Sequence, residues 1–112
     1  MIIEKIVLQH LASSTGLPCY PEVPEDPEAE YIIIEKIGSG RSDGIDRATV
    51  AVKSCSTKSL LRAAEINEAA KAAMDDLITL PQIFSSRLNS DYNFTNTKDK
   101  TYRYQAVYDL IF

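Results

Sequence analysis

The run from residue 101 to residue 112 is the feature that most constrains the fold of this chain. Tyrosine and aliphatic residues alternate with polar ones along it, as in Tyr104, Ala106 and Tyr108 against Arg103 and Gln105. A period of two is typical of a β-strand with one face in a core and the other towards solvent. Such a strand needs a sheet whose apolar face is covered by another layer. At 112 residues the chain fits one such domain, spanning residues 1–112.

Two more strands are predicted in the first half of the chain. Residues 31–37 read YIIIEKI, a β-branched and aromatic run that follows a proline-rich stretch and precedes a glycine. Residues 45–54 alternate again, with Ala, Val and Val on one side. Gly38 to Gly44 is expected to be a mobile, turn-rich loop that joins the two strands into an antiparallel hairpin.

Two helices are predicted from apolar residues at helical spacing. The first covers residues 1–13 and stops near Gly16. The second covers about residues 58–79, with Ser56 or Thr57 as its N-cap and a packed stripe rich in alanine. Small side chains let such a helix lie close to a sheet or to a neighbouring subunit.

The remaining segments complete the predicted order. Residues 82–94 indicate a strand weakened by polar residues, and residues 95–100 a polar hairpin loop before the last strand. Whether residues 17–23 form a short edge strand is left open. The order of helix, optional strand, two strands, helix and two strands predicts an α+β fold. We expect a mainly antiparallel sheet of four to five strands with two helices packed on one face.

A proline-acid connector occupies residues 17–30. Its four prolines recur at every third position, and its five acidic residues stand without a basic one. This spacing favours an extended, polyproline-like path. Two interpretations stay open: a solvated surface connector, or an acidic contact strip for a basic partner.

Charge and length exclude several classes of protein. The net charge of −4 argues against nucleic acid as the main partner, because such binders usually carry a basic surplus. No apolar run approaches the roughly 20 residues of a membrane span. The first residues lack the apolar stretch of a secretory signal, so no membrane or secretory role is expected.

The chain offers little for catalysis or cofactor binding. His10, Cys19 and Cys55 are too few for a structural zinc site, and the cysteines do not form a CxxC pair. We expect a packed histidine and two ordinary half-buried thiols. The glycines between residues 38 and 44 have the wrong spacing for a phosphate loop and precede a strand. No nucleophile has a nearby base. The prediction is a protein without cofactor or enzymatic activity.

Nearly the whole chain resembles the small tail-completion proteins of long-tailed bacteriophages, the tail terminator and head–tail joining group. The stretches that carry the resemblance are PEVPEDPEAEYIIIEKIGSG, ATVAVKSCS leading into LLRAAEINEAAKAAMDDL, and the tyrosine-rich SDYNFTNTKDKTYRYQAVYDL. The resemblance implies a ring, commonly hexameric, that stops tail tube polymerisation and joins the tail to the head. Its partners would be copies of itself, the tail tube protein and the head connector protein. It would assemble in the host cytoplasm and end at the head–tail junction of the virion.

Contacts with these partners are expected at the two predicted loops. The candidate contact residues are Arg41, Asp43 and Arg47 in the first, and Asn96, Lys98 and Lys100 in the second. Two alternatives remain. One is a head-completion or adaptor protein at the connector. The other is a small cytoplasmic binding module or an enzyme with a cryptic site.

Overall fold

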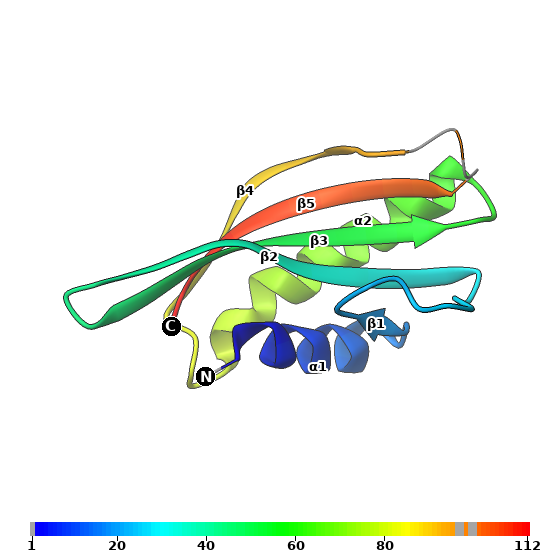
Figure 1. Cartoon of the computed structure of the whole chain (residues 1–112). Coiled ribbons are helices and arrows are strands. Elements are labelled where there is room, and N and C mark those ends of the chain that lie inside the picture. Colours follow the sequence, from blue (N-terminus) through cyan, green and yellow to red (C-terminus); the bar gives the residue numbers. More distant parts are fainter. Residues whose placement is uncertain (1, 96–97, 99–100) are drawn as a thin grey trace.

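The computed structural model describes residues 2–95, 98 and 101–112, and within them the elements follow the predicted order (Figure 1). This confirms the α+β fold, with helices and a five-stranded sheet. The elements are α1 (Ile3–Thr15), β1 (Cys19–Tyr20), β2 (Glu30–Ser42), β3 (Ile45–Ser56), α2 (Leu60–Asp75), the 3-10 helix η1 (Asp76–Thr79), β4 (Ser85–Asn93) and β5 (Tyr102–Ile111).

The strands lie in the order β1-β2-β3-β5-β4. Only β1 runs parallel to its neighbour β2, while the other described pairs are antiparallel. The optional strand at residues 17–23 therefore exists, as two residues at one edge of the sheet. Because α2 carries the chain back along the sheet, the β2–β3 and β4–β5 turns lie at opposite ends of the molecule (Figure 1).

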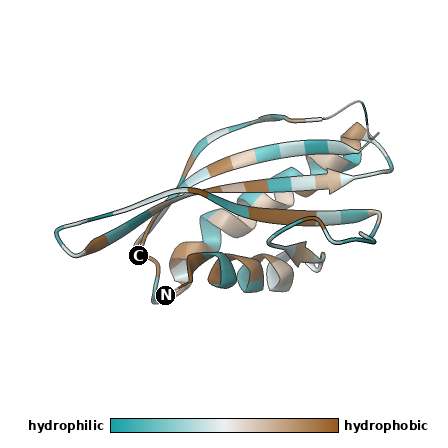
Figure 2. Cartoon of the chain, in the orientation of Figure 1, coloured by the Kyte–Doolittle hydropathy of each residue, from teal (hydrophilic) through white to brown (hydrophobic). Residues whose placement is uncertain are grey.

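The core lies between the two helices and one face of the sheet, here called the inner face. Hydrophobic residues recur along α1, β2 and β3 (Figure 2). Side chains two residues apart on each strand share the face, as the alternation predicts. Its buried strand residues are Ile32, Ile34, Ala48, Val50, Val52, Ala106, Tyr108 and Leu110, and its buried helical residues include Ile3, Val7, Leu11, Ile66 and Met74.

Polar side chains connect the helices to each other and to β5. His10 Nε2 donates a hydrogen bond of 2.9 Å to the carbonyl oxygen of Ala73, so the histidine packs between α1 and α2. The hydroxyl of Tyr108 donates to the carbonyl of Lys71 at 3.2 Å and to Asp75 at 3.0 Å. Burial, and then the bond to Asp75, raises the pKa of Tyr108. The alanine stripe is also confirmed, because Ala63, Ala70 and Ala73 are buried.

The predicted loop from Gly38 to Gly44 is wrong in extent. β2 continues to Ser42 and pairs with β3 up to Ile45, which leaves a two-residue turn. Asp43 and Gly44 adopt φ of 53° and 77°, the left-handed values that a two-residue hairpin turn needs. An Asp-Gly pair is a strong signal for a two-residue hairpin turn, and here it sets the register between β2 and β3. The other glycines of this stretch had suggested a mobile loop.

The start of the long helix also differs from the prediction. Ser59 is the N-cap, and its side chain accepts a hydrogen bond from the backbone N–H of Arg62. Ser56 is still the last residue of β3, because it pairs with both Glu30 and Tyr102. The α-helix ends at Asp75 and continues as η1, so the predicted length divides into two kinds of helix.

The opposite face of the sheet, here called the open face, carries no helix in the described chain. Its small apolar cluster joins Tyr31, Ile33 and Cys55 to Tyr20. Cys55 is fully buried here, so the prediction of two half-buried thiols holds only for Cys19. Burial raises the pKa of Cys19 to about 11, which keeps the thiol protonated and unreactive near neutral pH.

Truncation of Leu11 to alanine should destabilise the protein by about 2–5 kcal/mol. Leu11 is fully buried between α1 and the sheet, so the change leaves a cavity and removes buried area. Leu61→Ala is the matched control, because that side chain on α2 is 71% exposed and should change stability by less than about 0.5 kcal/mol. Urea unfolding of both variants measures the difference, and equal effects would contradict the assigned core.

Candidate interaction surface

A hairpin arm, residues 37–47, extends from one end of the sheet beyond the helical layer (Figure 1). It contributes to an elongated shape of 44 × 24 × 24 Å. Arg41 forms a bidentate ion pair with Asp46, with N–O distances of 2.7 and 3.1 Å. The pair raises the pKa of Arg41 and lowers that of Asp46. Both side chains are solvent-accessible, so the pair orders the arm more than it stabilises the fold.

At the root of the arm, the open face forms a groove of about 740 Å³. This volume lies within the usual range for ligand sites, about 300–1,000 Å³. We call it the glycine groove. Its lining residues are Gly38, Ser39, Gly40, Arg47, Ala48, Thr49, Ser85, Arg87, Leu88, Asn89, Asp109, Leu110 and Ile111.

The strand register explains why the groove is hollow. Two neighbouring rows of paired residues cross β2, β3, β5 and β4 on this face. In both rows the β2 position is a glycine, so β2 contributes no side chain to either row. The first row is Gly38, Thr49, Asp109 and Arg87, and the second is Gly40, Arg47, Ile111 and Ser85.

Charge in the glycine groove comes from two arginines and one aspartate. Thr49 Oγ1 donates to one carboxylate oxygen of Asp109 at 2.9 Å, and Asn89 Nδ2 donates to the other at 3.0 Å. Neither Arg47 nor Arg87 has an ion pair or side-chain hydrogen bond with any residue that the structure describes. These two guanidinium groups are therefore the charges with unused hydrogen-bonding capacity in the groove.

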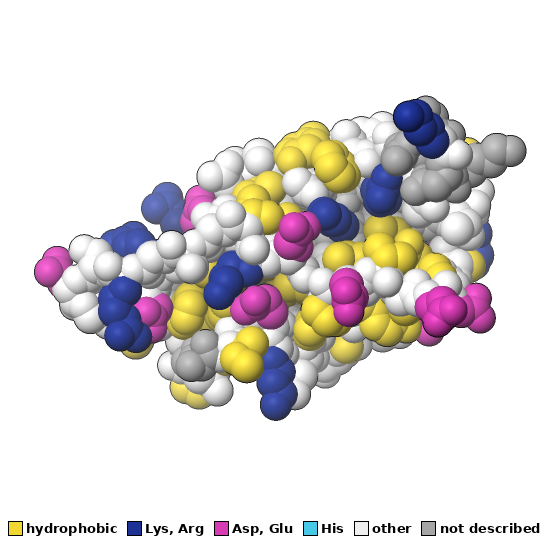
Figure 3. Space-filling model, in the orientation of Figure 1, with side chains coloured by type: hydrophobic (Ala, Val, Ile, Leu, Met, Phe, Trp, Pro, Cys, Tyr) yellow, Lys and Arg dark blue, Asp and Glu magenta, His cyan; other side chains and the backbone are white. Residues whose placement is uncertain are grey.

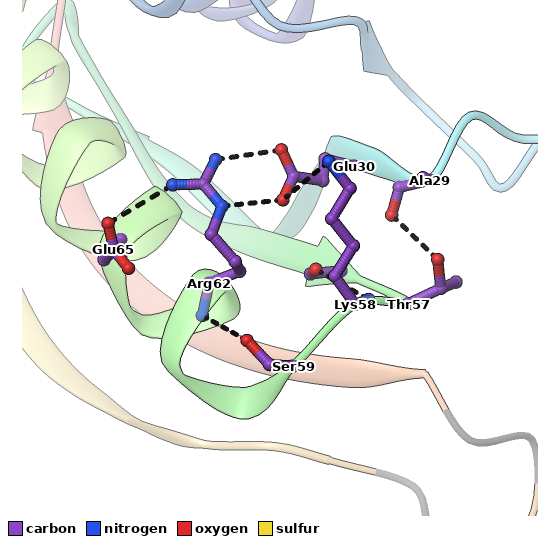
Figure 4. A network of polar contacts seen from close by, with 8 residues as sticks. Ala29, Glu30, Thr57, Lys58, Ser59, Arg62 and Glu65 are labelled. Atoms are coloured by element: carbon purple, nitrogen blue, oxygen red, sulfur yellow. Dashed lines mark hydrogen bonds and ion pairs between the residues drawn. The ribbon is translucent and has the colours of Figure 1, made fainter.

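The connector loop, residues 21–29, lies at the other end of the molecule and is held in place where β2 begins (Figure 4). Glu30, the first residue of β2, forms a bidentate pair with Arg62 of α2, both N–O distances being 2.8 Å. The backbone N–H of Thr57 donates to the carbonyl of Ala29 at 2.9 Å. The hydrogen bond from Arg62 is the largest cause that lowers the pKa of Glu30.

The other end of the connector loop is attached through Tyr20. Its hydroxyl donates to the Glu28 carboxylate at 2.7 Å, which lowers the pKa of Glu28 and raises that of Tyr20. Between these attachments Glu22, Glu25 and Asp26 are exposed, and they form no ion pair with any described residue. Figure 3 shows acidic side chains gathered at this end, on the right of the view.

The structure separates the predicted contact residues. Arg41, Asp43 and Arg47 all lie on the hairpin arm, but only Arg47 lines the glycine groove, since Asp43 forms the turn. Lys98 is exposed and belongs to the β4–β5 connection at the opposite end of the molecule. The predicted residues Asn96 and Lys100 lie outside the described residues.

Sequence reasoning missed Arg87 and Asp109 as residues of the same surface as Arg47. They come from β4 and β5, and only the strand order brings them beside β3. The available signal was Gly38 and Gly40, two glycines at alternate positions before an Asp-Gly turn. That spacing indicates a hairpin strand with one bare face.

A metal cluster and a membrane-spanning helix each require particular features of the described part of the chain. Among the described residues, no group of three or more His, Cys, Asp or Glu side chains could hold a metal ion. None of the described helices has the length and apolar character that a bilayer crossing requires.

Comparison with known proteins adds a fold relationship. No protein-family model matches this chain, and a search of curated proteins finds no similar sequence. Among solved structures, the fold is similar to that of a chain described as "Virion of native gene transfer agent (GTA) particle", with a TM-score of 0.64. The two are 15% identical, and the similarity covers 97% of this chain and 92% of the other. At that identity the likeness shows a common fold.

Replacement of Gly40 by valine should raise the free energy of unfolding by about 0.5–1 kcal/mol, because glycine weakens a strand interior. An added Cβ at Gly40 would meet nothing within 4 Å, and its φ is not positive. Gly44→Val should instead destabilise by about 1–2 kcal/mol, because φ is 77° there. Thermal unfolding distinguishes the two, and a destabilised Gly40→Val would contradict the bare face of β2.

Acid should remove the contribution of the Glu30–Arg62 pair. The pKa of Glu30 is lowered in the folded state, so its stabilisation is complete above the unfolded pKa of about 4.5 and falls as pH drops towards the folded value. The stability difference between wild type and Glu30→Gln should therefore be largest at neutral pH and shrink below about pH 4.5. Urea unfolding across this range tests it, with Glu65→Gln as the control on the exposed side of Arg62.

Proposed function

We propose that this chain is a structural protein of a phage-like virion, where it forms a ring at the head-proximal end of the tail. In this role it terminates tail tube polymerisation and joins the tail to the head, with no reaction catalysed. The observation that carries the proposal is the fold shared, over nearly the whole of both chains, with a chain from a gene transfer agent virion.

The shape of the molecule supports assembly through surfaces at its two ends. The hairpin arm and the glycine groove lie at one end, and the connector loop and the β4–β5 connection at the other (Figure 1). When unlike surfaces meet, copies join head to tail, and a ring closes if the rotation between them divides a full turn. The short edge strand β1 and the edge strand β4 also leave backbone groups available for neighbouring chains.

The proposed partners follow from this role. They are other copies of the chain, the tail tube protein on one side of the ring and the head connector protein on the other. Assembly would take place in the host cytoplasm, and the finished position would be the head–tail junction. Pull-down against tube and connector proteins separates a terminator, which binds tube protein, from an adaptor, which binds only the connector.

Purified protein should form a ring of about six chain masses in light scattering, at high concentration or once tail tube subunits are added. The physical reason is that one head-to-tail contact between two copies is weak. The contact that closes the ring forms without immobilising another subunit, so the closed ring is more stable than an open chain of the same copies. Size-exclusion chromatography coupled to light scattering is the measurement. A chain that stays monomeric under every condition, tube subunits included, would contradict the proposal.

A further inference from the structure

We infer that the connector loop of one copy docks in the glycine groove of the next copy and sets the head-to-tail contact of the ring. This inference rests on the proposed function, because it names the surfaces through which the copies would join. It identifies one occupant for the groove, a second copy of this chain.

Charge complementarity is the first argument. The groove presents Arg47 and Arg87, whose guanidinium groups have no ion-pair partner among the described residues. The connector loop presents Glu22, Glu25 and Asp26, whose carboxylates are likewise unpaired there. Guanidinium and carboxylate groups form strong bidentate hydrogen bonds, and such pairs fix the register of an interface.

The aspartate in the groove does not cancel this match. Both oxygens of Asp109 already accept hydrogen bonds, from Thr49 and from Asn89. Its charge is thus held by neutral donors on the floor of the groove. An incoming acidic segment can bond to the arginines without competing for those donors.

The shape of the groove suits a main-chain segment. Gly38 and Gly40 leave two adjacent rows of the sheet without a β2 side chain, so the backbone of a docking loop can approach the strand closely. The connector loop contains three prolines, at positions 21, 24 and 27, which restrict its backbone before it binds. A backbone that is restricted in this way loses less conformational entropy on docking.

The connector loop is also held ready at both ends. Tyr20 bonds to Glu28 at one end, and Glu30 bonds to Arg62 at the other. These contacts fix the loop on the body while its central carboxylates stay exposed. Preorganisation of this kind reduces the cost of ordering a loop in an interface.

The positions of the two surfaces require a second copy. The groove lies at the arm end of a molecule 44 Å long, and the connector loop lies at the other end (Figures 1 and 3). A chain therefore cannot fill its own groove with its own loop. The connector loop and the glycine groove are different surfaces, and each copy carries one of each. This is the arrangement that a head-to-tail ring needs.

Charge reversal in the full-length protein tests the inference. Arg47→Glu with Arg87→Glu, or Glu22→Lys with Glu25→Lys and Asp26→Lys, should each weaken self-association about a hundredfold or more, through like-charge contact. One chain carrying all five changes should associate again, because both surfaces are reversed. Lys5→Glu with Lys36→Glu is the control for the arginine pair, since it changes net charge equally at residues that neither line the groove nor pair with Glu30. Sedimentation velocity at low and moderate salt measures the mass.

A second variant blocks the groove by volume alone. Gly40→Val should fill the floor and weaken association while the fold stays at least as stable. Ser42→Val is its control, because it adds a valine side chain to β2 outside the groove lining. This pair of variants tests the docking even if a charge-reversed chain folds poorly.

The outcomes separate the inference from the proposed function. If the wild-type protein forms a ring and both charge-reversed variants and Gly40→Val form the same ring, the docking is wrong. The proposed ring assembly is then not contradicted. Equal loss in the Lys5/Lys36 control also overturns the docking, because net charge alone would then explain the effect. A wild-type chain that is monomeric in all conditions overturns both. If the groove variants keep their mass but lose binding to duplex DNA, the groove serves a polyanion and the inference is wrong.

Discussion

The pairing of β3 with both β2 and β5 is the interaction on which the rest of the structure depends. Ten consecutive residues of β3, from Arg47 to Ser56, have a partner on β5, and the same strand pairs with β2 along its length. Its inner face supplies Val50 and Val52 to the main core. Because β3 is hydrogen-bonded along both edges and covered by the helices on its inner face, it fixes the register of β2 and β5. A slip by one residue would turn its apolar side chains out of the core.

That same register produces the glycine groove. Once Thr49 and Arg47 are placed by β3, the residues opposite them on β2 are Gly38 and Gly40, and those beside them on β5 are Asp109 and Ile111. The hollow is therefore a consequence of strand pairing combined with two missing side chains. It needs no separate loop or lid. A surface of this kind is as rigid as the sheet, which suits an interface between repeated copies.

The two ends of the molecule have different chemistry, and this gives the chain a direction. The arm end has the groove with its two arginines, and the opposite end has the acidic connector loop, fixed through Glu30 and Arg62. The proposed ring would use this difference, because a contact between unlike surfaces joins copies head to tail. The similarity to a virion chain is at the level of the fold.

The sequence by itself determined most element types and the faces that β3 and β5 bury, because hydrophobic period and turn residues are local properties. The strand of residues 101–112, the alanine-rich helix and the packing of His10 all follow from such patterns. Local patterns also misplaced two boundaries. The glycines of residues 38–44 suggested a loop, but β2 continues through them because it pairs with β3. Ser56 was predicted as a helix cap, but it belongs to β3 and pairs with both neighbouring strands.

Only the tertiary structure decided which residues meet. The strand order β1-β2-β3-β5-β4 places Arg87 and Asp109 beside Arg47, although they lie 40 or more residues away in sequence. It also sends the two hairpin connections to opposite ends, so Lys98 lies at the other end of the molecule from the hairpin arm. The physical reason is that pairing between distant strands is set by the joint burial of several elements, which no single segment of sequence encodes.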